Sequence, residues 1–417
     1  MVIKGNIISA DRFGEIRIIK NGYIVIKDEK IANLSDILPF EYKDDELIDY
    51  GNKLIFQAFS DMHLHAPQFP MLGMGYDLEL LDWLNTYTFP TEAKFSNVEY
   101  AKKTYKVLAK ELIKNGTTRV AMFSSLHKDS TLILMDELDK AGISGYVGKV
   151  NMDRNGGVDL EEDTDDSIND TIDWIKKSNF KNIRPIITPR FIPSCTPKLL
   201  KALGEIAEKY DLKIQSHLSE NISEINLVKS LENVTEYYKA YEKYGLWNNK
   251  TLMAHCVHSS EEEIKSLRDN GVYVVHCASS NNNLTSGYAR IRYLLNNGVK
   301  VVLGSDIAAG DKLSMFDNVV ETIKASKARV IIGDNLAFLT PEEAFYLATS
   351  AANEFFGEKP GFAVGNKFNA IVLDDSDLLN TEKLSIKERF ERMFYLREED
   401  AIKVVYSNGK AVYNSKN

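Results

Sequence analysis

The chain has 417 residues, of which 44% are hydrophobic, and a formal net charge of −9 at pH 7. This length can bury one large core and a smaller second one. The charges show no long basic cluster, which argues against nucleic acid or an anionic membrane surface as a partner. The sequence also has no apolar run of membrane-spanning length.

The three cysteines, Cys195, Cys256 and Cys277, form no Cys-x-x-Cys pair. An odd number without that spacing argues against a disulfide framework and against a thiolate metal site. The first residues are strand-like and lack a secretory hydrophobic region. These features favour a reducing, cytoplasmic location.

The two ends of the chain show the short alternating pattern of antiparallel strands. Residues 14–19 and 22–28 are expected strands, and Lys20-Asn21-Gly22 between them predicts a hairpin turn. Residues 365–374 and 401–406 continue the pattern near the C-terminus. Neither end alone is long enough to bury a face. We therefore expect residues 1–57 and 364–417 to join in one small β-sandwich domain.

From residue 54 onward, short apolar runs alternate with helical patterns. Eight strands, each followed by a helix, predict a parallel (β/α)8 barrel over residues 58–363. A doubly wound sheet is the alternative, but no Gly-x-Gly-x-x-Gly follows any strand. The expected strands are residues 54–62, 117–123, 145–152, 183–191, 213–218, 251–256, 272–277 and 300–304. The clearest expected helices are residues 98–114, 131–141, 167–177, 197–210, 261–270 and 341–356.

Two insertions interrupt this alternation, at residues 66–96 and 222–247. The first is too apolar for a free loop, with Leu80, Trp83 and Tyr87 among its side chains. It is expected to pack over the barrel mouth or against a partner. We favour a subunit interface and hence a homodimer, with a lid on the chain's own barrel as the alternative.

Five of the seven histidines lie at or next to the C-terminal ends of expected strands, where barrel enzymes place their chemistry: His63, His65, His217, His255 and His276. Asp306 follows the eighth strand. Imidazole nitrogens with one carboxylate suit Zn²⁺ or Fe²⁺, with an open position for a water of lowered pKa. The favoured ligands are His63, His65, His217 and Asp306. His255 is expected to donate hydrogen bonds near the metal, and the role of His276 stays open.

A metal-activated water also needs a group that moves its proton. Glu220 lies three residues after His217 and can stand beside the metal without ligating it. Asp61 precedes the first histidines and is expected either to support the ligands or to cap the strand end.

The His-x-His after the first strand, the histidines after the fifth and sixth, Asp306 and the terminal β unit resemble the amidohydrolase superfamily. Within it, residues 81–90 (Leu-Asp-Trp-Leu-Asn-Thr-Tyr-Thr-Phe-Pro) and 215–221 (Gln-Ser-His-Leu-Ser-Glu-Asn) are similar to the guanine deaminases. Departures are Gln57-Ala58 in place of Pro-Gly, and Ala278 where the family carries proline. The fourth strand has no lysine where binuclear relatives carry a bridging one, which argues for one metal.

The resemblance implies one zinc per subunit, held by His63, His65, His217 and Asp306. It implies that a zinc-activated water attacks guanine C2, releasing ammonia and giving xanthine. The residues implied to be catalytic are Glu220, Asp306 and His255, and those implied to bind the purine are Gln68, Arg190, Phe191, His217 and His255.

Two other functions remain open. One is an amidohydrolase acting on a different aminopurine, an s-triazine or a cyclic amide, and the other is a non-catalytic scaffold relative. The cytidine-deaminase fold is excluded, because its Pro-Cys-x-x-Cys signature is absent.

Overall fold

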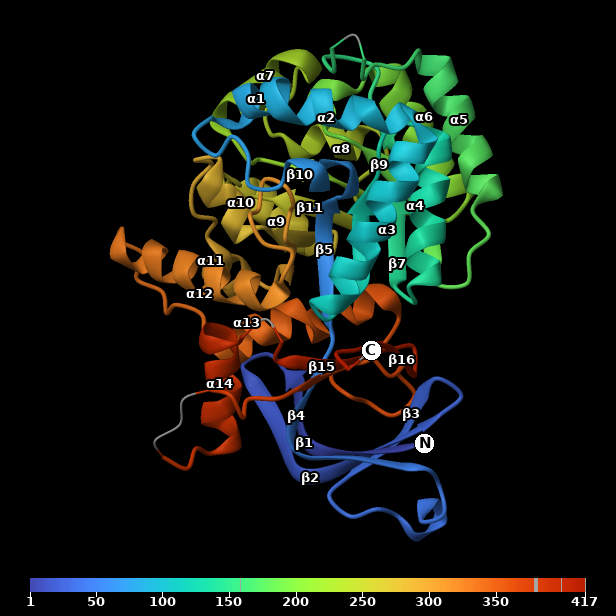
Figure 1. The fold of residues 1–417 in the computed structure, drawn as a ribbon. Coiled ribbons are helices and arrows are strands. Elements are labelled where there is room, and N and C mark those ends of the chain that lie inside the picture. Colours follow the sequence, from blue (N-terminus) through green and yellow to red (C-terminus); the bar gives the residue numbers. More distant parts are fainter. Residues whose placement is uncertain (158, 379–381, 399, 417) are drawn as a thin grey trace.

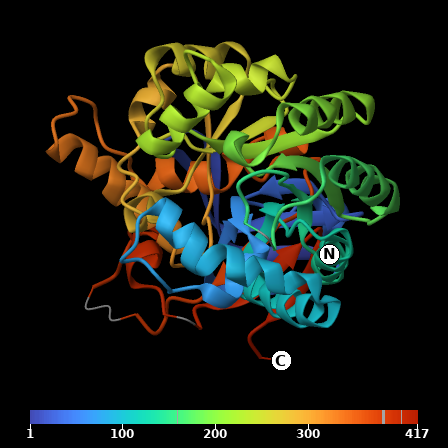
Figure 2. The same cartoon turned by 90° about the horizontal axis from the view of Figure 1, so that it is seen from above.

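The computed structural model describes residues 1–157, 159–378, 382–398 and 400–416. Eight parallel strands in the order β5-β6-β7-β9-β10-β11-β12-β13 form a nearly closed barrel, and helices surround it (Figures 1 and 2). The predicted (β/α)8 class is therefore confirmed. The barrel strands are β5 (Phe59–His65), β6 (Thr117–Phe123), β7 (Ser144–Gly148), β9 (Ile183–Pro189), β10 (Lys213–Leu218), β11 (Thr251–His255), β12 (Tyr273–His276) and β13 (Lys300–Leu303).

The segment after β13 joins the last strand to the first. The backbone N–H of Asp306 donates to the carbonyl of His63 over 2.8 Å, and the N–H of His65 donates to the carbonyl of Ile307 over 2.9 Å. These two bonds bring the eighth strand's carboxylate beside the first strand's histidines.

Helices cover the outside of the barrel, and several begin at side-chain caps. Asn97, Asp163 and Thr196 each accept a backbone N–H from the first turn of the helix that follows. The helices around the barrel are α3 (Val98–Lys114), α4 (Lys128–Lys140), α5 (Thr164–Lys177), α6 (Pro197–Lys209), α7 (Ile222–Glu232), α8 (Tyr238–Lys243), α9 (Glu261–Asp269), α10 (Ala278–Asn283), α11 (Ile291–Asn296), α12 (Met315–Ile331) and α13 (Pro341–Ala348). None of the described helices is both long and apolar enough to cross a membrane.

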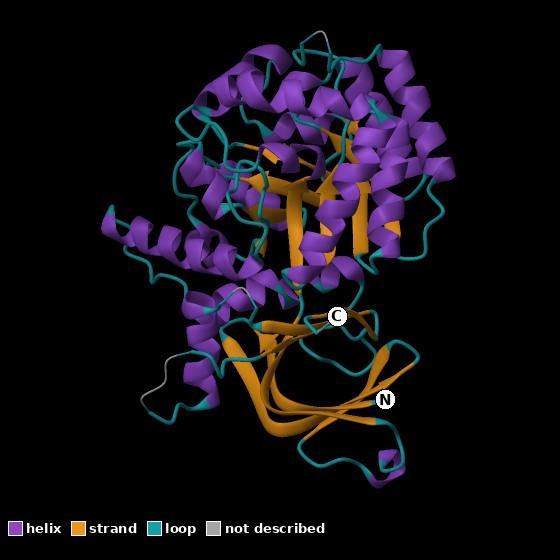
Figure 3. Cartoon of the chain, in the orientation of Figure 1, coloured by secondary structure: helices purple, strands orange, loops and turns teal. Residues whose placement is uncertain are grey.

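The chain ends build a second sheet of seven strands, in the order β16-β15-β14-β4-β1-β2-β3, that curls on itself below the barrel (Figures 1 and 3). Its inner face packs apolar side chains from both ends of the chain, among them Ile7, Phe368 and Val404. Its strands, and the helix beside them, are β1 (Val2–Arg12), β2 (Glu15–Lys27), β3 (Lys30–Ser35), β4 (Leu47–Gln57), β14 (Ala370–Leu373), β15 (Ile402–Ser407), β16 (Lys410–Asn414) and α14 (Ile386–Leu396). The exact division at residues 57 and 363 stays a prediction.

The expected hairpin at residues 20–22 is wrong. β2 runs through this stretch as one strand, and Asn21, with φ of +51°, lies beside a register shift where its N–H donates to Asn6 Oδ1. The turn lies instead at Phe13-Gly14, where Gly14 adopts φ of +77°. An Asn-Gly pair suits a bulge as well as a turn, because both need left-handed backbone.

Three expected elements are divided in the structure. The run 54–62 changes sheets at Ala58: residues before it pair with β14, and Phe59 pairs with Thr117 of the barrel. The run 145–152 is split into β7 and β8 (Val150–Asn151). The helix expected over 341–356 ends at Ala348, and two 3₁₀ turns follow it. The side chain of Arg119 donates to the carbonyl of Thr349, just past the end of α13. That carbonyl therefore has a hydrogen-bond partner without a further turn of helix.

The first insertion lies across the barrel mouth, at the end away from the seven-stranded sheet (Figure 1). It comprises a 3₁₀ turn (Ala66–Met71), α1 (Leu80–Trp83), a π turn (Leu84–Thr88) and α2 (Phe89–Ala93). We call residues 66–96 the lid. Its buried side chains pack against Leu284, Ala308 and Ala309 of the barrel loops, as one of the two predicted alternatives requires.

Candidate functional site

Backbone conformation at the strand ends directs the polar side chains into the barrel mouth. His255 is the register partner of Leu218, whose side chain packs outward against the helices. Regular alternation would send His255 outward too, but its φ of +74° turns its side chain into the mouth. Asp306 also has positive φ, +51°. Such backbone is uncommon for residues other than glycine and gathers at functional sites.

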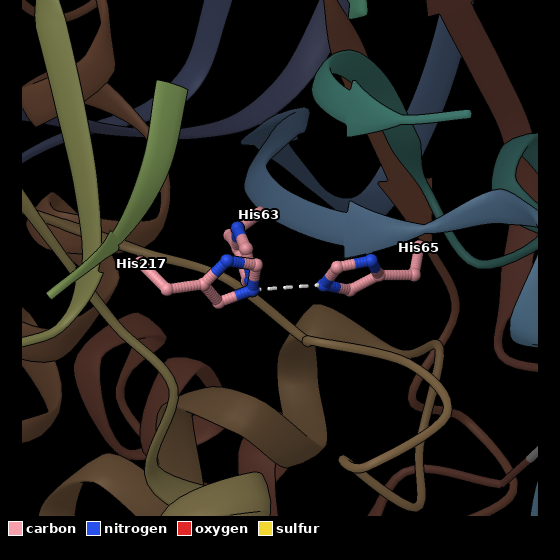
Figure 4. Close-up of side chains that lie close together, drawn as sticks. All are labelled: His63, His65 and His217. Atoms are coloured by element: carbon pink, nitrogen blue, oxygen red, sulfur yellow. Dashed lines mark hydrogen bonds between the residues drawn. The ribbon is translucent and has the colours of Figure 1, made fainter. Parts of the chain in front are cut away.

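Three imidazoles meet at the mouth, His63 and His65 from β5 and His217 from β10 (Figure 4). Their ligand nitrogens all lie within 4.8 Å of one another. The Nε2 atoms of His65 and His217 are 3.2 Å apart, and Asp306 Oδ1 lies 3.3 Å from His63 Nε2 and 3.5 Å from His65 Nε2. The structure thus brings together all four predicted metal ligands.

The protonation states of these rings suit a metal. His217 Nδ1 lies 2.6 Å from the carbonyl of Arg190. A carbonyl only accepts, so Nδ1 carries the proton and Nε2 presents a lone pair. Burial above all, and then the neighbouring histidines, lower the pKa values of His65 and His217 well below the usual value, so both rings are neutral. His63 Nε2 is buried and has no hydrogen-bond partner among the described residues.

Asp306 contributes a carboxylate to this cluster. Burial opposes its charge, but His63, His255 and a 2.5 Å hydrogen bond from the Ser280 hydroxyl to Oδ2 outweigh burial and lower the pKa of Asp306 to about 2. Three imidazole nitrogens and one ionised carboxylate form a donor set that fits a borderline divalent cation such as Zn²⁺ or Fe²⁺.

Glu220 and His255 face each other beside the cluster. Glu220 Oε2 lies 3.4 Å from His255 Nε2, which is also 3.8 Å from Asp306 Oδ2. Burial raises the pKa of Glu220, and the charge of His255 opposes that rise without cancelling it. Burial disfavours the charged form of His255, but the two carboxylates outweigh burial and raise its pKa. A carboxylate with a raised pKa, next to a metal cluster, is equipped to take up and release protons.

The same pocket also presents hydrogen-bond donors. Arg190, Gln68 and Phe191 line it; that these three residues bind substrate stays a prediction. Arg190 and Gln68 are 3% and 2% exposed, so their polar groups turn toward the pocket and their protein partners rather than bulk solvent. The pocket therefore combines hydrogen-bonding groups with members of the metal cluster and Glu220.

Sequence reasoning missed several residues of the site. Glu92 of the lid forms an ion pair with Arg190, Asn281 accepts from His255 Nδ1, and Ser286 donates to Glu220. Glu224, Leu284 and Ala309 also line the pocket and were missed. Leu80, Trp83 and Leu84 line it too, and they belong to the insertion that was expected to pack over the barrel mouth or against a partner. The apolar spacing of residues 80–84 is a usable signal, whereas a single acidic residue in a helix, such as Glu92, gives none.

Asp61 and His276, whose roles the sequence left open, contact the backbone or the barrel exterior rather than the pocket. Asp61 accepts the N–H of Ser305 over 2.9 Å and its hydroxyl over 2.5 Å, so it fixes the backbone next to Asp306. Asp61 also accepts from the backbone of His63, at 3.4 Å. His276 is buried on the outer side of β12, since its register partner Leu303 packs against the helices. It does not line the pocket.

Comparison with known proteins covers the whole chain. A guanine deaminase from Dictyostelium discoideum is 34% identical, with 99% of this chain and 98% of that protein aligned, and one from Rattus norvegicus is 39% identical over 94% and 90%. A crystal structure of guanine deaminase from C. acetobutylicum, with guanine in its active site, superposes with a TM-score of 0.96 at 48% identity and 99% coverage of both chains.

More distant structures share the fold alone. The zinc complex of the atrazine chlorohydrolase TrzN from Arthrobacter aurescens has a TM-score of 0.87 at 18% identity, covering 99% of this chain and 95% of that one. The sequence model of the Amidohydrolase family matches residues 54–412, which include every metal ligand predicted above. The chain belongs to the amidohydrolase family.

Proposed function

We propose that the chain hydrolyses guanine to xanthine and ammonia. The observation that carries this proposal is a single pocket lined by His65, His217, Asp306 and Glu220 together with Arg190 and Gln68. The similarity to guanine deaminases over almost the whole chain supports the same reaction, and one of them holds guanine in its active site.

The metal site takes one divalent ion, zinc in the first instance and Fe²⁺ as an alternative. His63, His65, His217 and Asp306 would hold it. When bound, the metal supplies a Lewis acid that lowers the pKa of a water molecule toward neutrality. The fourth barrel strand, β9, carries no lysine, which supports one metal rather than two.

Glu220 moves the protons of the reaction. Its carboxylate takes one proton from the attacking water and delivers it to the ring nitrogen N3 as the water oxygen bonds to C2. The second proton of that water passes to the amino group, the C2–N bond breaks, and ammonia leaves. His255 lies beside this path and can donate to the oxygen on which negative charge develops. The ionised Asp306 lies next to it and can accept a hydrogen bond from the remaining O–H, whose proton passes to the amino group.

Arg190, Gln68 and Phe191, which we call the donor wall, bind the purine. Arg190 presents N–H groups that suit two acceptors side by side, such as guanine O6 and N7. Gln68 offers an amide N–H to the ring edge, and Phe191 provides an apolar flank. His217 and His255 complete the contacts on the metal side. The presence of these side chains in the pocket lining supports these roles.

The test is ammonia release from guanine by purified protein, beside Glu220→Gln. We expect the variant to lose about 10²- to 10⁴-fold in kcat, because a positioned proton shuttle contributes that much. Metal analysis should find close to one ion per chain in both proteins. A metal-loaded wild type inert on guanine but active on an s-triazine or another aminopurine would reject the proposed substrate. Protein with neither metal nor turnover would favour a scaffold.

We also propose that the chain acts in the cytoplasm as a homodimer. The apolar side chains of the lid do not by themselves support a homodimer, because Leu80, Trp83 and Leu84 are buried against their own barrel. Sedimentation equilibrium would decide it: a mass near twice 47.1 kDa is expected, and a monomer at all concentrations would reject it.

A further inference from the structure

Glu92 is a buried carboxylate that holds two pocket residues without lining the pocket itself. Its side chain belongs to α2 of the lid, and the residue is 2% exposed. Oε2 accepts from Arg190 Nη1 over 2.6 Å. Oε1 accepts from Arg190 Nη2 over 3.1 Å and from Gln68 Nε2 over 2.9 Å. One carboxylate thus fixes both polar side chains of the donor wall.

These contacts determine the orientation of each donor. A two-point pair with a carboxylate fixes the plane of the Arg190 guanidinium. Phe89, three residues before Glu92 on the same helical face, places its ring centroid 5.2 Å from the guanidinium carbon. Gln68 is held at both ends of its amide, because its Oε1 also accepts the N–H of Ala308 over 3.1 Å. The remaining N–H groups of Arg190 and Gln68 are left for a ligand.

The pair also sets the charge of the wall. Arg190 and Glu92 are both almost completely buried and neutralise each other. The wall therefore offers oriented donors with little net charge. Such a surface suits a neutral ring with adjacent oxygen and nitrogen acceptors better than an anionic ring.

We propose that Glu92 is a positioning residue that makes the site selective for purines with an oxo group at C6. The inference rests on the proposed function, in which Arg190 and Gln68 read that edge. Through its hold on these two side chains, the lid contributes to specificity as well as covering the mouth.

Glu92→Gln tests the proposal with little change in shape. Its amide nitrogen would face an N–H of Arg190 or Gln68, so one of these contacts is lost. We expect the KM for guanine to rise about 100-fold, the loss typical of a misplaced binding group, with kcat changed only a few-fold. The inhibition constant of 2-aminopurine, which lacks the 6-oxo group, should stay within a few-fold of wild type. An unchanged guanine KM, or an equal loss for both ligands, would overturn the proposal.

Two further variants make the result specific. Glu358→Gln removes the carboxylate partner of another buried arginine, Arg119, whose Nη1 lies 3.0 Å from it near the start of β6. It should lower the melting temperature but leave the guanine KM and the 2-aminopurine inhibition constant unchanged. If Glu92→Gln folds poorly, Glu92→Asp keeps the charge and shortens the side chain. It should also raise the guanine KM, by a smaller factor, and leave the 2-aminopurine inhibition constant within a few-fold of wild type.

Arg190→Lys separates failure of this inference from failure of the proposed function. If it leaves the guanine KM unchanged, Arg190 does not read the purine, and the proposed reading of the substrate fails. If it raises the KM while Glu92→Gln does not, only the role of Glu92 is rejected. If both variants raise the guanine KM, the KM of the double variant should rise by much less than the product of the two single increases, because both changes disturb the same group.

Discussion

At the scale of single residues, two buried histidines at neighbouring strand ends have opposite surroundings. His255 is turned inward by its positive φ and finds Glu220, Asp306 and Asn281 around its ring. His276, one strand further, keeps the regular alternation and points outward, where neither ring nitrogen has a partner among the described residues. The same residue type therefore has polar partners in one place and, among the described residues, none in the other.

His276 should make the protein sensitive to acid. Burial, and then the charge of His255, lower the pKa of His276 to about 3. Between that pH and its unfolded pKa of about 6.5, the unfolded chain binds a proton that the folded chain does not, so stability falls as the pH is lowered. Relative to His276→Leu, the wild type should lose about 2 kcal/mol more unfolding free energy between pH 8 and pH 5.

Urea unfolding of the wild type and His276→Leu at both pH values measures this difference. Leucine is chosen because the register partner of His276 is already leucine, and because it removes the titrating ring without adding a polar group. All other titrating groups are shared, so they cancel in the comparison. Equal losses in the two proteins would show that His276 is protonated in the fold or has found a partner.

At the scale of elements, the lid depends on a tight contact beneath its helices. Gly75 has φ of +78°, and a Cβ there would lie 2.6 Å from the ring of Tyr87 and 3.0 Å from that of Trp83, which lines the pocket. The π turn of the lid precedes Pro90, whose ring and missing N–H are incompatible with a regular helix one turn earlier. Local geometry of this kind sets where α2, and hence Glu92, lies.

Gly75→Ala should disturb substrate binding while the barrel stays folded. Alanine at positive φ costs roughly 1–2 kcal/mol, and here it also pushes Trp83. We expect the KM for guanine to rise about tenfold, the equivalent of 1.4 kcal/mol, with metal content unchanged. Gly73→Ala is the matched control, since Gly73 has φ of +87° with nothing within 4 Å of the added carbon. Equal kinetic effects in both variants would assign the loss to backbone strain alone.

The elements also show what the sequence can predict about this site. Parallel barrel strands end at one mouth, so residues at those ends, from His63 to Asp306, are predictable as a group. Glu92 is different, because it contacts Arg190 only when the lid folds across the barrel mouth. The residues next to Glu92 in the sequence do not predict how the lid folds. The change of sheets at Ala58 is likewise hidden, since an apolar run looks the same whether it pairs in one sheet or two.

At the scale of the whole molecule, an aromatic cluster joins the barrel to the seven-stranded sheet. Phe316 of α12 lies 4.7 Å from Phe59 of β5, 6.4 Å from Phe56 of β4 and 5.5 Å from Phe394 of α14, measured between ring centroids. Phe56 and Phe59 lie on either side of the change of sheets at Ala58. The cluster therefore couples the two sheets where the chain passes between them.

Phe316→Ala should weaken this coupling as well as total stability. Removing a buried phenylalanine costs about 3–5 kcal/mol. Trp83 lies in the lid, Trp174 in α5, and Trp247 in the segment between α8 and β11. Their fluorescence therefore follows the barrel domain, whereas far-ultraviolet circular dichroism follows both sheets.

The wild type should show coincident unfolding curves by the two probes, because the aromatic cluster makes the stability of each sheet depend on the other. In Phe316→Ala, part of the dichroism should be lost before the fluorescence changes, since the smaller sheet then has fewer contacts to hold it. Phe95→Ala is the control, because Phe95 is equally buried but packs against Tyr100 and Tyr105 beside the barrel. It should lower stability while leaving the curves coincident, and coincident curves in Phe316→Ala would place the coupling elsewhere in the interface.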